Sequence, residues 1–342
     1  MIGATGGDVP DVSFIVGAFN VAPYIAEAVR SALDQTGVRV EVVVADDAST
    51  DDTAAVIAHM AETDPRVVLY RRPRNGGLSA ARNDSLARAR GRWIAVLDGD
   101  DVIARNRSRR LIDLAEASGA DIVADNYERI AEDGTPLGTT MIPAMAFPHA
   151  FPVDLADFVG GNVTFRKTRR SYGAIKQMYD ARFIAQHGLQ YREDPDLRNE
   201  DFLFCAEALI AGARFIVTSE ALYKYRQRGT SISHRLSSAH FAAMQRANAD
   251  LALQRYARAG SGKSARLATA VAAYDDALAN GGRFVRLAES VKRGGWAAAF
   301  AEWVVAPALW PLTARFGAEA VVRRLSASSR RAYRGGRPCR AS

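Results

Sequence analysis

Short apolar runs alternate with helical runs along the first hundred residues, and this alternation constrains the fold most. Strand-like apolar runs lie at 12–20, 40–50, 67–72 and 93–101, and runs with helical spacing lie between them at 22–35, 51–62 and 78–89. Near-continuous apolar strands joined by helices are typical of a parallel sheet with both faces covered. We therefore predict an α/β fold with a mostly parallel central sheet flanked by helices.

Polar side chains come at the ends of three of these apolar runs. Asn20 ends the first run, Asp46 and Asp47 lie in the second, and Asp98 and Asp100 lie in the fourth. Ligands of open α/β sheets bind beyond the carboxyl ends of the strands. The sequence therefore predicts a binding site at this edge of the sheet, and not a group of acids inside the core.

The fourth run ends in Asp98-Gly99-Asp100-Asp101, where three carboxylates stand close together. Such carboxylates repel one another and resist burial, so a cation or solvent must face them. Two carboxylates separated by one residue can hold a hard divalent cation, which in turn holds a diphosphate. An acidic turn and the aspartate pair of a magnesium-dependent phosphatase stay open as alternatives, because this short pattern is common by chance.

The stretch DDASTDDT at 46–53 has two interpretations, which can both hold. Asp47, at a strand end, could accept hydrogen bonds from a nucleobase or a ribose. The same stretch could cap the next helix, with Ser49 or Thr50 as the N-cap and with Asp51 and Asp52 in the first turn.

Two glycines, Gly76 and Gly77, precede a helix and could cradle a phosphate at its N-terminus. The sequence contains neither GxGxxG nor GxxxxGK[ST], which disfavours a dinucleotide-binding or P-loop site. Residues 131–160 are rich in Pro, Gly and turn residues, and we expect them to wrap over the site.

Two charged stretches in the second half are further candidates. Glu200 and Asp201 open a helix predicted at 199–213, where they could cap the helix or supply a general base. The segment at 214–233 reads as a strand and a cationic, hydroxyl-rich loop that suits a phosphate, with a solvated loop as the alternative. This loop contains Tyr225, Arg226, Arg228 and Ser231.

Charge and cysteine content add weaker constraints. The 342-residue chain has a net charge of +7, and residues 323–342 hold Arg but no acid, which suits nucleic acid, an anionic membrane or a solvated tail. The two cysteines, Cys205 and Cys339, have no metal-type spacing, and we expect Cys205 in the core of a protein from a reducing compartment. The N-terminus shows no signal-peptide pattern.

Trp296, Trp303 and Trp310 are spaced so that they would share one helical face. Two prolines and a glutamate interrupt this apolar stretch, and we do not predict a transmembrane helix. Together with the basic tail, the tryptophans fit an interfacial anchor, and a packed helical extension is the alternative.

Five sequence phrases, in this order, resemble family 2 glycosyltransferases with the GT-A fold. They are VSFIVGAFN, VVVADDASTDDT, NGGLSAARNDSLARARGRWIAVLDGDD, NEDFLF and LYKYRQRGTSIS, within residues 10–235. The chain also resembles the bacterial exopolysaccharide branch of this family, of the succinoglycan kind. The resemblance implies the GT-A nucleotide-sugar-binding fold. Beyond about residue 238, the Ala- and Arg-rich composition predicts a helical C-terminal extension.

The resemblance also implies how the nucleotide sugar is bound. Gly17, Ala18 and Asn20 would border the nucleotide. Asp47 would bind the uracil or its ribose, and Arg82 would lie near the nucleotide sugar. The donor-binding set is completed by Asp98 at the ribose or sugar, and by Arg226 and Arg228 in a loop that closes on the diphosphate. The family's usual Pro-Thr or Pro-Val is replaced here by Gly17-Ala18, which argues against side-chain roles and leaves backbone contacts open.

For catalysis, the resemblance implies that Asp201 is the base and that Glu200 orients the loop or binds acceptor hydroxyls. Asp100 and Asp98 would hold Mg²⁺ or Mn²⁺ and, through it, the diphosphate. The implied reaction is inverting transfer from a nucleotide sugar, a UDP-sugar, to a saccharide or lipid-linked saccharide acceptor in polysaccharide biosynthesis.

Two other functions stay open. A sugar-phosphate nucleotidyltransferase can share such a sheet and acidic site, but its Gly-rich signature loop is missing from IVGAFN. A non-catalytic scaffold subunit is the second alternative, and the intact acids argue against it.

We expect four segments in the chain. They are a flexible N-terminus at 1–10, the GT-A domain at 11–237, a helical extension at 238–322 and a basic, disordered tail at 323–342. No nucleic-acid partner is expected. Because lipid-linked sugars are common acceptors of such enzymes, we expect a cytoplasmic protein in peripheral contact with the anionic inner membrane.

Overall fold

The alternation predicted from the sequence is present in the computed structural model, which describes residues 9–142, 149–163, 172–228, 236–250, 262–304, 306 and 310. The first part of the chain forms β1 (Val12–Ala18), α1 (Ala22–Leu33), β2 (Val40–Asp46), α2 (Thr53–Thr63), β3 (Val67–Arg71), α3 (Leu78–Leu86) and β4 (Trp93–Val96). β2 and β4 are buried along their whole length. This is the pattern of strands that are covered on both faces.

The second part adds shorter strands and further helices. They are β5 (Val102–Ile103), α4 (Arg107–Ser118), β6 (Ile122–Ile130), β7 (Pro136–Thr140), β8 (Ala150–Pro152), α5 (Leu155–Gly161), the 3-10 helix η2 (Tyr172–Ala174), β9 (Gln177–Asp180), α6 (Ala181–His187), α7 (Glu200–Ile210) and β10 (Phe215–Arg226). The helix predicted at 199–213 and the strand predicted to follow it are confirmed.

The described strands form one sheet in the order β3-β2-β1-β4-β9-β6-β10-β5, with β7 beside β6 and β8 beside β10. β3, β2, β1 and β4 are parallel neighbours, as are β6 and β10. β9 lies antiparallel between β4 and β6. The sheet is therefore parallel in its first half, where the alternation was read, and mixed in its second half.

The stretch at 131–160 forms regular elements where the sequence suggested a wrapping segment. β7 pairs with β6, β8 pairs with β10, and α5 packs against α10. Residues 143–148 lie outside the described residues. Backbone pairing with distant strands, and not local periodicity, therefore orders the described part of this stretch.

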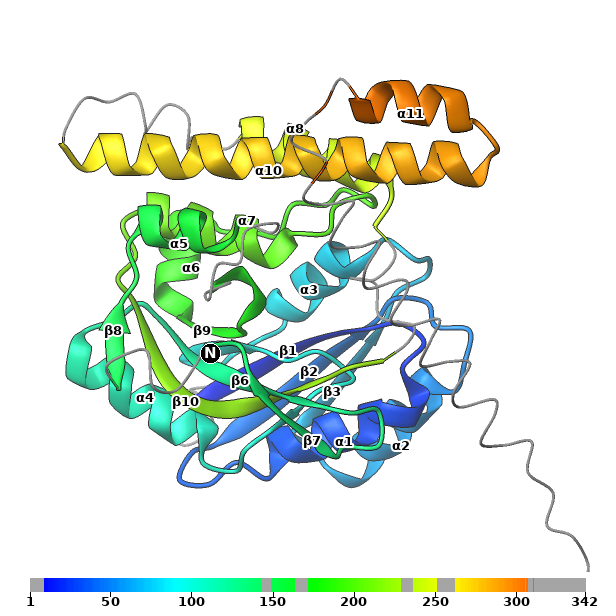
Figure 1. Cartoon of the computed structure of the whole chain (residues 1–342). Coiled ribbons are helices and arrows are strands. Elements are labelled where there is room, and N and C mark those ends of the chain that lie inside the picture. Colours follow the sequence, from blue (N-terminus) through cyan, green and yellow to red (C-terminus); the bar gives the residue numbers. More distant parts are fainter. Residues whose placement is uncertain are drawn as a thin grey trace, which may run out of the picture.

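Helices cover both faces of the sheet (Figure 1). α1, α2 and α4 lie on one face, and α3, α5, α6 and α7 lie on the other. α8 (Ser238–Asp250) and α10 (Gly262–Lys292) form a further layer above α5 and α7, and α11 (Trp296–Val304) packs on α10. Phe241 and Tyr274 belong to the same buried core as the sheet, and Tyr274 stacks on Phe202 of α7 with 4.6 Å between ring centroids.

The C-terminal end of the described chain exposes large apolar side chains. They are Trp296, Phe300, Val304 and Trp310, of which Trp296 is 67% exposed. Ala306 is not helical, so the three tryptophans do not share one continuous helical face as the spacing suggested. Within the described ranges, no helix combines the length and the apolar composition needed to span a bilayer.

Candidate active site

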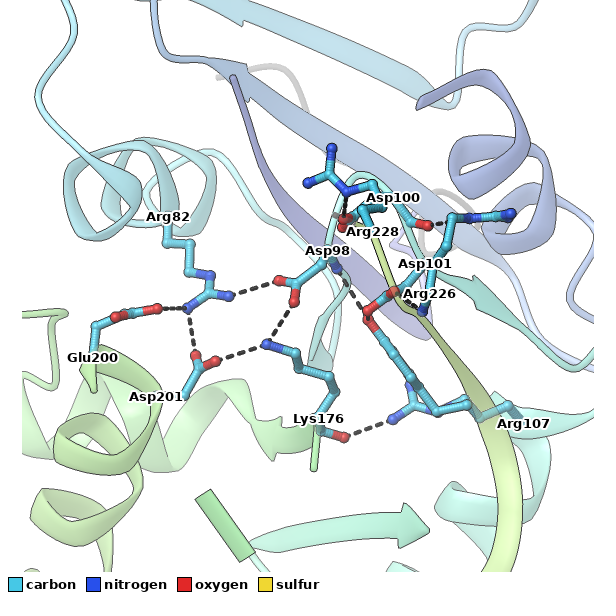
Figure 2. Close-up of polar contacts among 11 residues, drawn as sticks. Arg82, Asp98, Asp100, Asp101, Arg107, Lys176, Glu200, Asp201, Arg226 and Arg228 are labelled. Carbon is cyan, nitrogen blue, oxygen red and sulfur yellow. Dashed lines mark hydrogen bonds and ion pairs between the residues drawn. The ribbon is translucent and has the colours of Figure 1, made fainter. Parts of the chain in front are cut away.

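Charged side chains from both halves of the chain meet beyond the carboxyl end of β4 (Figure 2). Arg82 comes from α3, Asp98 follows β4, Lys176 precedes β9, and Glu200 and Asp201 open α7. Arg82 and Asp201 are far apart in the sequence, yet Arg82 Nη1 lies 2.5 Å from Asp201 Oδ1. The residues thus meet at the edge of the sheet where the sequence predicted a site.

Arg82 is fully buried and is bound by three carboxylates. Its Nη1 donates to Asp201 Oδ1 and also to Glu200 Oε1, at 2.5 and 3.2 Å. Its Nη2 donates to Asp98 Oδ1 at 2.8 Å. A guanidinium suits this position because it presents several donors in one rigid plane.

Gly17 explains how α3 comes close enough to present Arg82. A Cβ atom at Gly17 would lie 2.7 Å from Leu78 Cδ1 and 3.3 Å from Ala81 Cβ, both on α3. The missing side chain therefore lets α3 pack closely on β1. Ala18 is buried, and its carbonyl accepts a hydrogen bond from the Asp47 N–H at 2.8 Å. Gly17 and Ala18 have no polar side chain, so only their backbone can bind a ligand.

Lys176, which the sequence analysis did not single out, completes a ring of alternating charges. Its Nζ lies 2.8 Å from Asp98 Oδ2 and 2.8 Å from Asp201 Oδ2. Arg82 holds the other oxygen of each carboxylate. We call Arg82, Asp98, Lys176 and Asp201 the charge ring; Glu200 lies beside it, paired to Arg82. A single lysine in a mixed segment carries no spacing signal that could have identified it.

Burial and ion pairing act in opposite directions in this cluster. Burial would raise the pKa of Asp98, but Lys176 and Arg82 outweigh it and lower that pKa to about 2. Burial would lower the pKa of Lys176, but Asp201 and Asp98 outweigh it and raise that pKa. For Glu200, burial raises the pKa and Arg82 offsets this only in part. Asp98 and Lys176 are therefore both charged at neutral pH.

The three acids at 98–101 turn to three different partners, which answers the crowding seen in the sequence. Asp98 faces the charge ring. Asp100 Oδ2 lies 2.6 Å from Arg228 Nε, and Asp101 accepts a hydrogen bond from the Tyr223 hydroxyl at 2.7 Å. Burial, followed by the charge of Asp98, raises the pKa of Asp100, and the same two causes raise that of Asp101 further.

The two arginines after β10 differ in their surroundings. Arg226 is only 3% exposed, and its guanidinium donates to the carbonyls of Asp100 and Glu132, each at 2.8 Å, and pairs with Glu27 at 2.7 Å. Arg228 instead pairs with the Asp100 carboxylate. Arg226 thus joins the turn after β4 to β10, while Arg228 faces a candidate metal ligand.

Tyr225, a third member of the predicted cationic loop, packs against Tyr127 with 5.3 Å between ring centroids. Ser231 lies outside the described residues.

Asp47 is bound by the loop before α3. Its Oδ1 accepts hydrogen bonds from Arg72 Nη1 at 2.6 Å and from the Gly76 N–H at 2.9 Å, and its Oδ2 accepts one from the Gly77 N–H at 2.8 Å. Gly77 has a φ of +87°, which glycine adopts without strain. The two glycine amides considered as a phosphate cradle are therefore directed at a carboxylate of the protein.

The capping prediction for α2 is wrong in both of its parts. α2 begins at Thr53 with Asp52 at the N-cap, so the cap is neither Ser49 nor Thr50, and Asp51 and Asp52 precede the first turn and do not lie in it. The Ser49 hydroxyl accepts a hydrogen bond from the Asn20 N–H at 3.1 Å, and the Thr50 N–H donates to Asn20 Oδ1 at 2.8 Å. These residues are thus engaged in tying the loops after β1 and β2 together, so neither caps the helix.

The acids present fit a divalent cation that arrives with a diphosphate. No group of three or more His, Cys, Asp or Glu side chains suited to a metal occurs among the residues described. Mg²⁺ commonly uses only one or two carboxylates and takes its other ligands from water and substrate phosphates. Asp100 and Asp98 provide that number. Burial and, after it, the charge of Asp98 raise the pKa of Asp100, and a bound cation would offset both effects.

The chain is similar to proteins of one family. The family model described as Glycosyl transferase family 2 matches residues 13–194, more than half of the chain. Succinoglycan biosynthesis protein ExoO of Rhizobium meliloti (strain 1021) is 42% identical over 253 residues, which cover 74% of this chain and 70% of that protein. Succinoglycan biosynthesis protein ExoU of the same strain is 37% identical over 224 residues, covering 65% and 64%.

Two solved structures share the fold. S. aureus TarS 1-349 in complex with UDP-GlcNAc has a TM-score of 0.57 at 19% identity, covering 83% of this chain and 88% of that one. Mannosyltransferase PcManGT from Pyrobaculum calidifontis, in complex with GDP-Man and Mn2+, has a TM-score of 0.54 at 18% identity, covering 92% and 81%. At these identities, the likeness shows a common architecture alone.

Proposed function

Because the chain belongs to glycosyltransferase family 2, we propose that it transfers a sugar from a UDP-sugar to a saccharide or lipid-linked saccharide acceptor in exopolysaccharide biosynthesis. The two similar Rhizobium meliloti proteins, both named for succinoglycan biosynthesis, support this pathway class. The solved complexes with UDP-GlcNAc and GDP-Man support a nucleotide sugar as donor.

The placement of Asp201 carries this proposal. Its carboxylate stands at the N-terminus of α7, in the same charge ring as Asp98, and its side chain is 11% exposed. Each carboxylate oxygen can accept two hydrogen bonds. Arg82 and Lys176 use one position on each oxygen, so a position remains for an acceptor hydroxyl.

The proposed chemistry is one inverting displacement. Asp201 takes the proton of the acceptor hydroxyl as its oxygen forms a bond to C1 of the donor sugar. The bond from C1 to the phosphate oxygen breaks, and the nucleoside diphosphate leaves with the electron pair. A base placed in this way contributes roughly 10²- to 10⁴-fold to the rate. Asp98, held at both oxygens, would orient the ribose or the sugar.

The leaving diphosphate needs positive charge beside it. A divalent cation, Mg²⁺ or Mn²⁺, would supply such charge when it is held by Asp100 and Asp98. Arg228 stands at the same carboxylate, with its Nε 2.6 Å from Asp100 Oδ2, and so can reach a phosphate held there. The buried Arg226 would support the Arg228 side chain by fixing the chain just before Arg228.

The nucleotide would lie over the loops after β1 and β2. Gly17, Ala18 and Asn20 would border the nucleotide through their backbone. The Ala18 carbonyl and the Asn20 N–H bond to the loop after β2, and Asp47 in that loop is held by Gly76 and Gly77. The nucleotidyltransferase and scaffold alternatives are set aside because the family is one of glycosyltransferases.

A donor panel tests the proposal. Purified protein is incubated with UDP-, GDP- and dTDP-sugars, with Mn²⁺, Mg²⁺ or chelator, and release of nucleoside diphosphate and the anomeric configuration of the product are measured. We expect release from one UDP-sugar, dependence on the cation, and inversion at C1. Retention of configuration, or release of pyrophosphate, would contradict the proposed reaction.

We further propose that the protein contacts an anionic membrane surface in the cytoplasm. The exposed Trp296 and Phe300 on α11, each at least 65% exposed, support this because aromatic side chains favour the membrane interface. Sedimentation with anionic and neutral vesicles should show binding that weakens with salt and after removal of residues from 294 on. Equal binding to both kinds of vesicle would contradict the electrostatic part.

A further inference from the structure

The two functional carboxylates of the charge ring are held in a particular way. One oxygen of Asp98 and one oxygen of Asp201 face Arg82, at 2.8 and 2.5 Å. The second oxygen of each faces Lys176, at 2.8 Å in both cases. A carboxylate bound at one oxygen can still rotate about its Cβ–Cγ bond, whereas one bound at both oxygens cannot. Lys176 is thus the group that stops this rotation in both acids.

We propose that Lys176 is a positioning residue for sugar transfer. Its ammonium fixes the orientation of Asp201 toward the acceptor hydroxyl and that of Asp98 toward the donor. This inference rests on the proposed function and adds to it a residue that acts through the two acids. Rate depends steeply on such alignment, since a misplacement of about 1 Å can cost roughly 10²-fold.

The fold places the Lys176 backbone firmly, as a positioning role requires. Its carbonyl accepts a hydrogen bond from Arg107 Nη2 at 2.7 Å (Figure 2). Arg107 is itself fully buried and paired with the buried Asp125 at 2.8 Å. The next residue, Gln177, is also fully buried, and its amide donates to the Tyr172 carbonyl at 3.0 Å. A buried ion pair therefore holds the chain at the Lys176 carbonyl, and a buried amide holds it at the next residue.

Folding alone does not account for this lysine. Replacing both partners of a buried ion pair by packed apolar groups is often neutral or stabilising, whereas removing one partner alone is destabilising. Stability therefore explains why Lys176 is paired, but it does not require an ion pair at this place. Lys176 is 8% exposed and lies between two acids of the site. Its removal would leave Asp98 and Asp201 with Arg82 as their remaining shared cation in the ring. The ammonium therefore serves the arrangement of the acids.

The test compares three variants with wild type in steady-state transfer and in UDP binding with Mn²⁺. Lys176→Met removes the charge and keeps the length, and Lys176→Arg keeps the charge. Arg182→Met, in the first turn of α6 just after β9, removes an exposed cation paired with Asp180 and serves as the control. We expect Lys176→Met to lose roughly 10²-fold in kcat with little change in the Kd of UDP. Lys176→Arg should retain more activity, and Arg182→Met should match wild type.

A fourth variant separates positioning from folding. Lys176→Ala vacates the space between the two carboxylates, and added ethylammonium should restore part of the lost kcat, whereas ethanol should not. Equal kcat losses in the Arg and Met variants, no rescue by ethylammonium, or a UDP affinity that falls as much as kcat would each overturn the proposal. If Asp201→Asn abolishes transfer while Lys176→Met keeps the wild-type kcat, the role of Lys176 is disproved and the proposed function stands. If wild type transfers no sugar from any donor, the proposed function fails and this inference falls with it.

Discussion

Replacing Arg82 by Met is expected to destabilise the fold strongly at neutral pH. Methionine keeps an unbranched side chain in the space but removes every donor. Arg82 has no exposed surface, and its guanidinium pairs with Asp98, Asp201 and Glu200 at 2.5 to 3.2 Å. After the substitution, Asp98 and Asp201 retain the ammonium of Lys176, and Glu200 loses the guanidinium that it pairs with.

The expected magnitude follows from the burial of this group. Removing one partner of a buried ion pair typically costs about 3–5 kcal/mol, because an uncompensated charge is left behind. This corresponds to a change of roughly 10²- to 10⁴-fold in the folding equilibrium constant. An exposed pair is worth at most about 1 kcal/mol. Arg92→Met, which breaks the half-exposed pair with Glu116, is therefore the matched control.

The penalty should also depend on pH. The pKa of Asp98 is lowered from 3.8 to about 2 in the folded protein, with Lys176 and Arg82 outweighing burial. A carboxyl with a lowered pKa contributes stability that is present above its unfolded pKa and is lost as pH falls through its folded pKa. The Asp98 contribution is thus present above about pH 4 and lost between about pH 4 and pH 2. The difference in unfolding free energy between Arg82→Met and wild type should therefore become smaller as the pH falls from about 4 to about 2.

Urea denaturation followed by circular dichroism at several pH values measures these differences. The reasoning is refuted if Arg82→Met and Arg92→Met lower the unfolding free energy at pH 7 by the same small amount. A penalty for Arg82→Met that stays constant from pH 7 to pH 3 would refute the electrostatic part, since lost packing alone does not depend on pH.

Three further predictions concern single residues of the site and its loops. In single-turnover transfer at saturating donor, Asp201→Asn should lose roughly 10²-fold or more while UDP binding is retained, and Glu200→Gln should lose less; the opposite ranking would reverse the roles of the two acids. In titration calorimetry, Asp100→Ala should weaken UDP binding with Mn²⁺ and leave metal-free binding nearly unchanged; equal Mn²⁺-dependent affinity would contradict its role as a ligand. Ala48 has a φ of +58°, so Ala48→Gly should raise the unfolding free energy, measured by urea denaturation, by up to about 1 kcal/mol. An unfolding free energy at or below that of wild type would show that the loop is not strained.

The first half of the fold could be predicted because its signals are local. Apolar runs joined by helices predicted the parallel strands β1 to β4, and the position of acids at strand ends predicted the site. The GT-A fold and the family are confirmed by the comparisons. The roles assigned to individual residues remain predictions.

The second half could not be predicted because its order comes from distant partners. β9 has four residues and pairs antiparallel with both β4 and β6. Neither neighbour is close to it in the sequence, and so short a segment shows no clear period. Lys176 directly precedes β9, so its position depends on the placement of β9 between β4 and β6. The N-cap of α2 was missed for a related reason. Ser49 and Thr50 bond to Asn20, which lies in the loop after β1 and is distant in the sequence.

The acidic motif after β4 holds two carboxylates in different chemical environments. Gly99 lets the turn between them pack closely on α1, where an added Cβ would lie 3.1 Å from Ile25 Cδ1. Asp98 faces the charge ring and Asp100 faces Arg228. The pKa of Asp98 is lowered by the fixed cations of the charge ring, whereas the pKa of Asp100 is raised by burial and by the charge of Asp98 itself. Asp98 is therefore already satisfied by the protein, and Asp100 is the carboxylate that gains most from an added cation. That asymmetry is the physical reason to expect the metal-dependent part of donor binding to respond to changes at Asp100, and alignment of the acids to respond to changes at Lys176.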